Sequence, residues 1–161
     1  MIRATQVLKA GSWQAAPADR VTLSYDERHR RRLRYVAEAG TEFLLDLPRT
    51  TVLRGGDGLL LEDGRVIHVT AAAEPLLEIR AADADQLARL AWHIGNRHLP
   101  AQIATARILI REDSVIENML NGLGAVVRHV DEPFAPEPGA YDSSHSVPFA
   151  AGHSGHGHNH G

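Results

Sequence analysis

Cysteine is absent from this 161-residue sequence. Its absence excludes disulfide bonds, thiolate metal sites and a cysteine nucleophile together. Imidazole and carboxylate remain as the strong metal ligands, a set that suits nickel, zinc, copper or cobalt. Aromatic residues are also scarce, at 5% of the chain, so we expect cores built from Leu, Val, Ile and Ala.

Long hydrophobic runs are missing as well. The residues from Met1 to Gln6 contain no uninterrupted apolar stretch of the kind found in signal peptides, and no run approaches membrane-spanning length. We therefore expect a cytoplasmic protein. The formal net charge of -3 argues against a whole-protein role in binding nucleic acid or a membrane.

Strand patterns dominate residues 1–73. Alternating or apolar runs, separated by glycine-rich turns, occupy residues 20–25, 32–37, 42–47, 59–61 and 66–69. The second and third runs flank Ala39-Gly40 and predict a hairpin. No stretch in this half keeps a period of 3.6 residues. We predict a small all-β domain, either a sandwich or a barrel.

A basic run, Arg28–Arg34, stands out in this half. It can be interpreted as a nucleic-acid patch, or as a solvated loop that enters a strand with Arg32 and Arg34 outward and serves, at most, as a protein-docking surface. Only Tyr35 is available for stacking, and the acidic residues Asp26, Glu27 and Glu38 flank the run. Both observations favour the second interpretation. His29 and His68 have no second ligand at metal spacing, so we expect ordinary surface or strand histidines.

Strand and helix patterns alternate in residues 74–144. Strands are expected at residues 74–80, 101–104, 107–110 and 125–130, and helices at residues 84–94 and 114–120. Asp83, with Gln86, is predicted to cap the first helix, and Asp113 the second. The order βαββαβ predicts a ferredoxin-like layer of two helices on one sheet. The chain as a whole is therefore expected to be α+β.

Each helix is predicted to bury one apolar face. In the second helix that face consists of Val115, Ile116, Met119, Leu120 and Leu123. In the first helix the face runs from Leu87 to Ile94 at a spacing of three and four residues. Continued at about 100° per residue, the first helix would place His98 on this face and turn His93 away from it. We therefore expect His98 near an apolar surface and His93 more exposed, although Gly95 and Pro100 end the helix close by.

The C-terminus is rich in histidine. His153, His156, His158 and His160 lie within eight residues, separated by Gly, Ser and Asn, and His145 lies upstream. Such neighbours do not pack, so we expect residues 145–161 to form a disordered tail. Its imidazoles would bind divalent nickel, copper or zinc loosely and exchange them quickly. A purification tag is the alternative, but tags are usually uninterrupted histidine runs.

His98 alone has two interpretations, a satisfied core histidine or a metal ligand, and the tail strengthens the second. One ordered histidine per chain cannot form a stable site, but a two-fold dimer would supply a second copy. No motif of an enzyme accompanies it: the sequence has no nucleophile elbow, phosphate loop or HExxH helix. Enzymatic activity is therefore not expected.

Three stretches share features with one known family. They are His93–Pro100 with its Gly-Asn-Arg-His, Asp113–Leu120 followed by Leu123-Gly124-Ala125, and Pro133–Tyr141. With the β-rich first half and the histidine tail, they resemble the UreE urease accessory proteins, which are nickel metallochaperones. The resemblance implies a peptide- or partner-binding β domain in residues 1–73 and a ferredoxin-like metal-binding and dimerisation domain in residues 74–144.

The resemblance also implies a site and its partners. The histidine after Gly-Asn-Arg maps onto His98, one from each protomer of a homodimer, and tail histidines would complete or load the site. The expected metal is Ni2+, although Zn2+ or Cu2+ can bind imidazole as well. The expected partners are the urease apoprotein and its accessory proteins, including the accessory GTPase, and no nucleic acid or membrane. Some members carry further histidines where this chain has Ile110–Asp113, so extra capacity is expected in the tail. A general Ni/Zn/Cu buffer or sensor with no urease role is the alternative.

Overall fold

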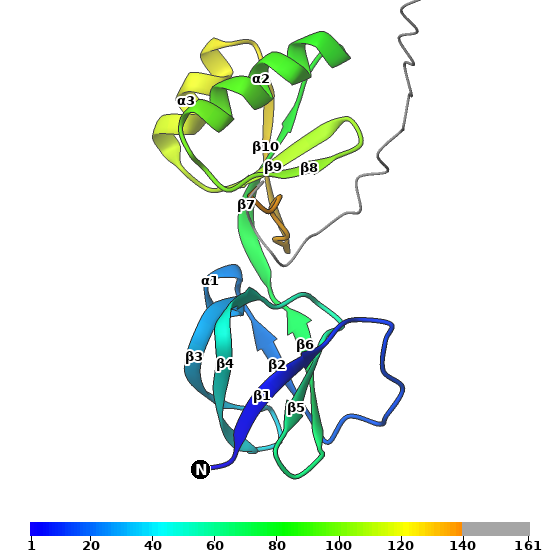
Figure 1. The fold of residues 1–161 in the computed structure, drawn as a ribbon. Coiled ribbons are helices and arrows are strands. Elements are labelled where there is room, and N and C mark those ends of the chain that lie inside the picture. Colours follow the sequence, from blue (N-terminus) through cyan, green and yellow to red (C-terminus); the bar gives the residue numbers. More distant parts are fainter. Residues whose placement is uncertain (140–161) are drawn as a thin grey trace, which may run out of the picture.

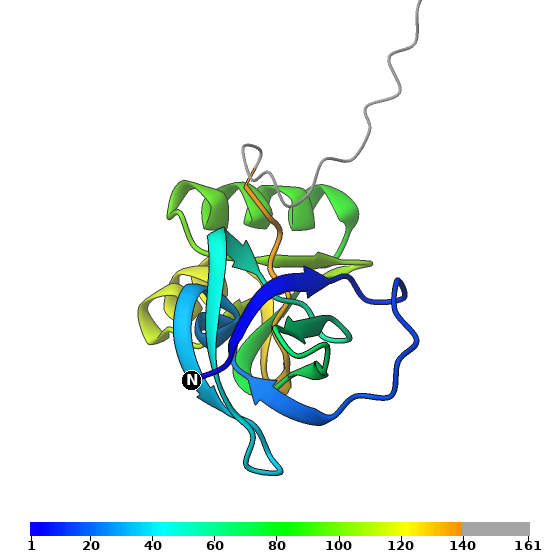
Figure 2. The same ribbon diagram turned by 60° about the horizontal axis from the view of Figure 1, so that its bottom comes forward.

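The computed structural model describes residues 1–139, which form two β-sheets with helices on the second (Figure 1). The first sheet has six strands in the order β2-β6-β5-β1-β4-β3. Its elements are β1 (Arg3–Leu8), β2 (Asp19–Leu23), α1 (Tyr25–Arg28), β3 (His29–Val36), β4 (Glu42–Val52), β5 (Gly58–Leu61) and β6 (Val66–Ala71). The sheet curls around an apolar core, as the view in Figure 2 also shows.

The all-β character of this half and the β3–β4 hairpin were predicted correctly. β3 pairs antiparallel with β4, and the turn between them places Gly40 at a φ of +94°, a conformation that favours glycine. The core consists mainly of aliphatic side chains, including Val21, Leu45, Leu59, Ile67 and Val69, together with Tyr35 and Phe43. The scarcity of aromatic residues is therefore matched by a largely aliphatic core.

Sequence patterns missed the one-turn helix α1. The run at residues 20–25 was expected to be a single strand, but β2 ends at Leu23. Ser24 then caps α1: its hydroxyl accepts from the Glu27 backbone N–H, and the Glu27 carboxylate accepts from the Ser24 N–H at 3.0 Å. Four helical residues are too few to show a period in the sequence.

The second sheet has four antiparallel strands in the order β10-β7-β9-β8. Its elements follow the expected order: β7 (Ala73–Arg80), α2 (Ala84–Asn96), β8 (Gln102–Ala104), β9 (Arg107–Arg111), α3 (Ser114–Gly122) and β10 (Val126–Pro133). Figure 1 shows both helices on the same side of this sheet. Their apolar faces pack on it through Leu77, Ile79, Leu90, Ile94, Ile108, Ile110, Ile116 and Leu120.

The helix caps agree with the sequence, but two residues of the predicted apolar face of α3 do not. Asp83 accepts from the Gln86 N–H at 2.8 Å, and Asp113 accepts from the N–H groups of Val115 and Ile116. The prediction that Val115 and Leu123 belong to the buried face was wrong, because 68% of Val115 and 39% of Leu123 are exposed. Leu123 lies at the C-cap, where the helix ends. Val115 directly precedes Ile116 and so lies about 100° away from it around the helix.

Arg28 joins the two sheets. Only 1% of this residue is exposed, and its guanidinium donates to the backbone carbonyls of Leu23, Leu53 and Phe134. The expectation that the whole run Arg28–Arg34 is solvated was therefore wrong at its first residue. The remaining residues form β3, not a loop. The planar guanidinium offers five N–H donors in a fixed arrangement, which allows it to satisfy three carbonyls at once.

Side-chain contacts of α1 complete this junction. The Tyr25 ring lies edge-on to Phe134, with centroids 5.5 Å apart, and its backbone N–H donates to Glu74 at 2.9 Å. Asp26 pairs with Arg111 of β9 at 3.0 Å. Phe134 is fully buried and packs with Leu76 and Leu109 on the sheet face away from α2 and α3. The segment after β10 therefore belongs to the contact between the sheets.

The predicted division of the chain at residues 73, 144 and 145 stays a prediction. The first sheet ends at Ala71, and β7 begins at Ala73. The expected tail, residues 145–161, lies outside the described residues.

Candidate metal centre

The end of α2 determines where His98 lies. Arg97 caps the helix with a φ of -89° and a ψ of 0°, and the His98 backbone N–H donates to the Gly95 carbonyl at 3.1 Å. His98 itself has a φ of +56°, in the left-handed region. Because the chain leaves the helical path here, the rotation of 100° per residue no longer applies.

The predicted exposures of the two histidines were therefore reversed. His98 is exposed, whereas His93 is half-buried and lies edge-on to the Trp92 ring, with centroids 5.1 Å apart. A positive φ at a residue with a side chain costs about 1 kcal/mol, and histidine is among the few side chains enriched there. Such a conformation occurs often at functional sites, so the backbone at His98 supports its candidacy on grounds independent of its chemistry.

The imidazole of His98 is unlike the other histidine rings of residues 1–139. His29 hydrogen-bonds Tyr25, His68 hydrogen-bonds Thr70 and contacts Trp13, and His93 contacts Trp92. His129 lies between two carboxylates. The His98 ring has no hydrogen bond, ion pair or aromatic contact within this part of the chain. Both of its ring nitrogens are therefore available to a ligand.

His129, in contrast to His98, has both of its ring nitrogens occupied by carboxylates. One ring nitrogen lies 2.6 Å from Glu112, and the other contacts Glu117 of α3. These hydrogen bonds, first with Glu112 and then with Glu117, raise the pKa of His129. A ring whose two nitrogens both bond to carboxylates has no free nitrogen to offer a metal ion. Glu112 lies in the Ile110–Asp113 stretch, where some family members carry histidines, and here it links β10 to the loop before α3, while Glu117 links β10 to α3 itself.

The surroundings of His98 contain an open cleft of about 170 Å³. Leu99 and Pro100, the two residues after His98, form one wall, and Ile110–Asp113 form the rest. Within residues 1–139, however, no group of three or more histidine, aspartate or glutamate side chains is arranged so that it could hold a metal ion. A metal ion at His98 would need ligands from a second protomer or from beyond residue 139.

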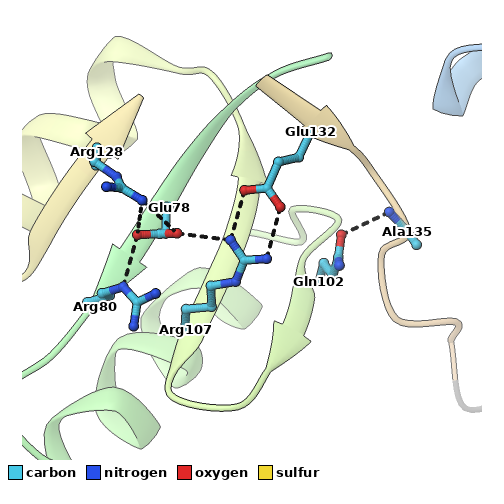
Figure 3. A network of polar contacts seen from close by, with 7 residues as sticks. All are labelled: Glu78, Arg80, Gln102, Arg107, Arg128, Glu132 and Ala135. Carbon is cyan, nitrogen blue, oxygen red and sulfur yellow. Dashed lines mark hydrogen bonds and ion pairs between the residues drawn. The ribbon is translucent and has the colours of Figure 1, made fainter. Parts of the chain in front are cut away.

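The C-terminal strap, which we define as residues 134–139, leads the chain back toward this region. The Ala135 N–H donates to the Gln102 side chain at 3.0 Å, a contact visible in Figure 3. The Glu137 N–H donates to the Ala101 carbonyl at 2.8 Å. Ala101 follows His98 by three residues, a reach of at most about 11 Å. The sequence-predicted ligands His145, His153, His156, His158 and His160 lie outside the described residues, and the strap itself runs beside the start of β8, the strand that follows His98.

A network of charged side chains, which the sequence patterns did not predict, lies on the face of the second sheet opposite the helices. Glu78 of β7, with only 4% of its side chain exposed, binds Arg80 and Arg107 at 2.9 Å each and Arg128 at 3.3 Å (Figure 3). Arg107 also holds Glu132 through two hydrogen bonds. The alternation of Leu76, Glu78 and Arg80 was a usable signal, because it places the carboxylate on the face away from Leu77 and Ile79.

Both halves of the chain match domains of one family of accessory proteins, so the chain is a two-domain protein of that class. Residues 2–72 match the N-terminal domain of the UreE urease accessory protein, and residues 74–161 match its C-terminal domain. The chain belongs to the UreE urease accessory protein family.

Individual relatives are similar along most of the chain, and each is named urease accessory protein UreE. The protein of Bradyrhizobium sp. (strain ORS 278) is 60% identical over 91% of this chain and 70% of its own length. That of Chelativorans sp. (strain BNC1) is 54% identical over 99% of both chains. That of Rhodobacter capsulatus is 50% identical over 100% of this chain and 94% of its own. No helix among residues 1–139 is long and apolar enough to cross a membrane.

Proposed function

We propose that this protein is a nickel metallochaperone that delivers Ni2+ to the urease apoprotein as the urease active site is assembled. The observation that carries the proposal is the imidazole of His98, which is exposed, has no partner within residues 1–139 and sits on a backbone conformation that has an energetic cost. Membership in a family of urease accessory proteins supplies the recipient.

A homodimer would complete the site. A single imidazole binds a divalent ion weakly, and a two-fold axis beside His98 would bring a second copy to the same ion. Trp92, six residues before His98, is 64% exposed, an unusual state for so large an apolar side chain. A partner protomer that covers Trp92 would bury this area. The histidines of residues 145–161 would then complete or load the site, and Zn2+ or Cu2+ would compete for the same ligands.

The proposal includes a ferredoxin-like second domain and partners among the urease assembly proteins. The strand order β10-β7-β9-β8, with antiparallel pairing and both helices on one face, supports a ferredoxin-like second domain. The relatives' names support an encounter with urease. The proposal adds that this encounter takes place in the cytoplasm and includes the other urease accessory proteins, among them an accessory GTPase. The first domain would serve that encounter, as a partner-binding β domain.

Replacing His98 tests the proposal. His98→Asn removes the imidazole but keeps a side chain that tolerates a positive φ, so the fold should be retained. We expect the affinity of the tightest nickel site to fall by at least about tenfold in isothermal titration calorimetry. His29→Asn, in the first domain, is the matched control and should bind nickel as the unaltered protein does. An unchanged tightest site in His98→Asn would refute the assignment.

Truncation tests the role of the tail. A chain that ends after Val147 lacks His153, His156, His158 and His160 but keeps His98 and His145. We expect fewer nickel ions bound per protomer, because the removed imidazoles are the ligands of the weaker sites. Equilibrium dialysis with nickel measures this stoichiometry. An unchanged stoichiometry would contradict a metal-binding role for the four histidines.

A further inference from the structure

Strand β3 is an exposed edge of the first sheet. It stands at the end of the strand order, beside β4 alone, and Figure 1 places it at the outer margin of the sheet. Seven of its eight residues are exposed, and only Tyr35 is buried. An edge strand presents one row of backbone N–H and C=O groups that no strand of its own sheet pairs. This edge could therefore accept another extended chain.

Three of the four arginines of β3 have no carboxylate partner within the described chain. Ion pairs in this region join Arg34 to Glu42 and Arg3 to Asp46. Asp46 lies directly opposite Arg32 in the register, yet its carboxylate is engaged by Arg3. Within residues 1–139, Arg30, Arg31 and Arg32 consequently have no carboxylate partner, although the protein as a whole has a net charge of -3. A local excess of positive charge thus lies along the unpaired edge.

Apolar side chains accompany these arginines. Val36 is 61% exposed and Leu33 is 36% exposed. Arg32, Arg34 and Val36 share one face of the strand, since alternate residues point the same way, whereas Arg30 lies beyond a shift in the β3–β4 register. Because Arg34 already pairs with Glu42, an acidic strand paired along β3 would bring its carboxylates to the three arginines that lack a carboxylate partner, Arg30, Arg31 and Arg32.

Other occupants fit this edge less well. Single-stranded nucleic acid requires exposed aromatic rings for stacking, but Tyr35 is 5% exposed and packs against Phe43 at a centroid distance of 5.6 Å. A second copy of β3 would bring its own arginines against these, and like charges on neighbouring strands repel. The chemistry therefore selects an extended acidic segment of another protein.

We propose that β3 is a docking strand for an extended acidic segment of a protein that takes part in urease assembly, and that the segment pairs along the open edge beside Arg30, Arg31 and Arg32. This inference rests on the proposed function for the identity of the partner. Backbone pairing supplies affinity that is independent of sequence, and the arginines select carboxylates.

The test uses the full chain and a defined probe. The probe is a fluorescein-labelled peptide of alternating Glu and Val with the eight-residue length of β3. We expect fluorescence anisotropy to show binding that weakens as ionic strength rises, because salt screens exposed charges. The double variant Arg30→Glu with Arg32→Glu should bind at least about tenfold more weakly. The control, Arg20→Glu with Arg89→Glu, makes the same change of net charge at exposed arginines elsewhere and should bind normally.

Two further peptides separate edge pairing from simple charge attraction. A peptide with Lys in place of Glu should not bind. Glu-Val peptides that are N-methylated at alternate residues lose the N–H groups of one edge, so one of the two possible patterns should abolish binding and the other should not. Equal loss in both double variants, binding of the Lys peptide, indifference to N-methylation or no binding at all would each overturn the proposal.

Nickel titration of the same samples keeps this inference apart from the proposed function. The Arg30→Glu, Arg32→Glu variant should bind nickel as the unaltered protein does, since β3 and His98 belong to different sheets. Nickel binding without peptide binding would reject the docking strand alone. Peptide binding without nickel binding would reject the metallochaperone and leave β3 as a docking strand for an acidic segment.

Discussion

Arg28→Ala is expected to lower the free energy of unfolding by about 3–5 kcal/mol, because it leaves buried carbonyl groups without donors and opens a cavity. In the intact protein the guanidinium satisfies the carbonyls of Leu23, Leu53 and Phe134. Burial lowers the pKa of Arg28, which is the cost of placing a cation there. Arg28→Lys should not restore stability, because an ammonium group lacks the planar set of donors.

Urea unfolding followed by tryptophan fluorescence measures this effect in each half separately. Trp13 contacts His68 of the first sheet, and Trp92 lies on α2. In the Trp92→Phe background only Trp13 reports, on the first half, and in the Trp13→Phe background only Trp92 reports, on the second half. We expect the unfolding transitions of the two halves to coincide in the protein with Arg28. Arg28→Ala should destabilise the first half and so separate them. Arg30→Ala is the control at an exposed position and should change little. Equal stability of Arg28→Ala and Arg30→Ala would show that the buried guanidinium does not hold the sheets together.

The contrast between Arg28 and its neighbours explains how far the sequence predicts this fold. Local periodicity indicated the hairpin of the first sheet, the order of elements in the second and the caps of α2 and α3. The burial of Arg28 depends on hydrogen bonds to the carbonyls of Leu53 and Phe134, which lie 25 and 106 residues away in the chain. No local sequence pattern predicts contacts at such separations. The same holds for Glu78, whose partners Arg107 and Arg128 come from strands distant in sequence. Long-range polar contacts were therefore the part that pattern analysis could not supply.

His98 as a metal ligand stays a prediction, whereas its expected geometry was wrong. His98 could be named from Gly-Asn-Arg-His and from its place before Pro100. The exposure predicted for His98 was wrong, because the helix from which it was extrapolated ends at Asn96 and His98 itself adopts a left-handed backbone conformation. The free imidazole follows from tertiary contacts that occupy His29, His68, His93 and His129 instead. A sequence pattern can point to a histidine, but only the packing reveals which histidine has no other partner.

Glu78→Gln is expected to lower the free energy of unfolding by about 3 kcal/mol near neutral pH, because it removes a buried charge that three arginines share. The side chain is 4% exposed and contacts Arg80, Arg107 and Arg128. Glutamine preserves the shape, so the loss reports on charge and not on a cavity. Glu132→Gln, at a side chain that is 34% exposed, is the control and should have a much smaller effect.

The pH dependence of the same variant identifies the cause. Hydrogen bonds from Arg80 and then Arg107, with the charge of Arg128, hold the pKa of Glu78 below its ordinary value of 4.5. A carboxylate with a lowered pKa in the folded state stabilises the protein fully above 4.5, and this contribution disappears as the pH falls through the folded-state pKa. The difference in unfolding free energy between the unaltered protein and Glu78→Gln should therefore be constant near neutral pH and should shrink below about 4.5. Urea unfolding at a series of pH values measures it, and a difference that stays constant into that acidic range would mean that Glu78 does not act as a charge. Because the network ties β7, β9 and β10 together, this variant measures how much one buried charge contributes to the cohesion of the second sheet.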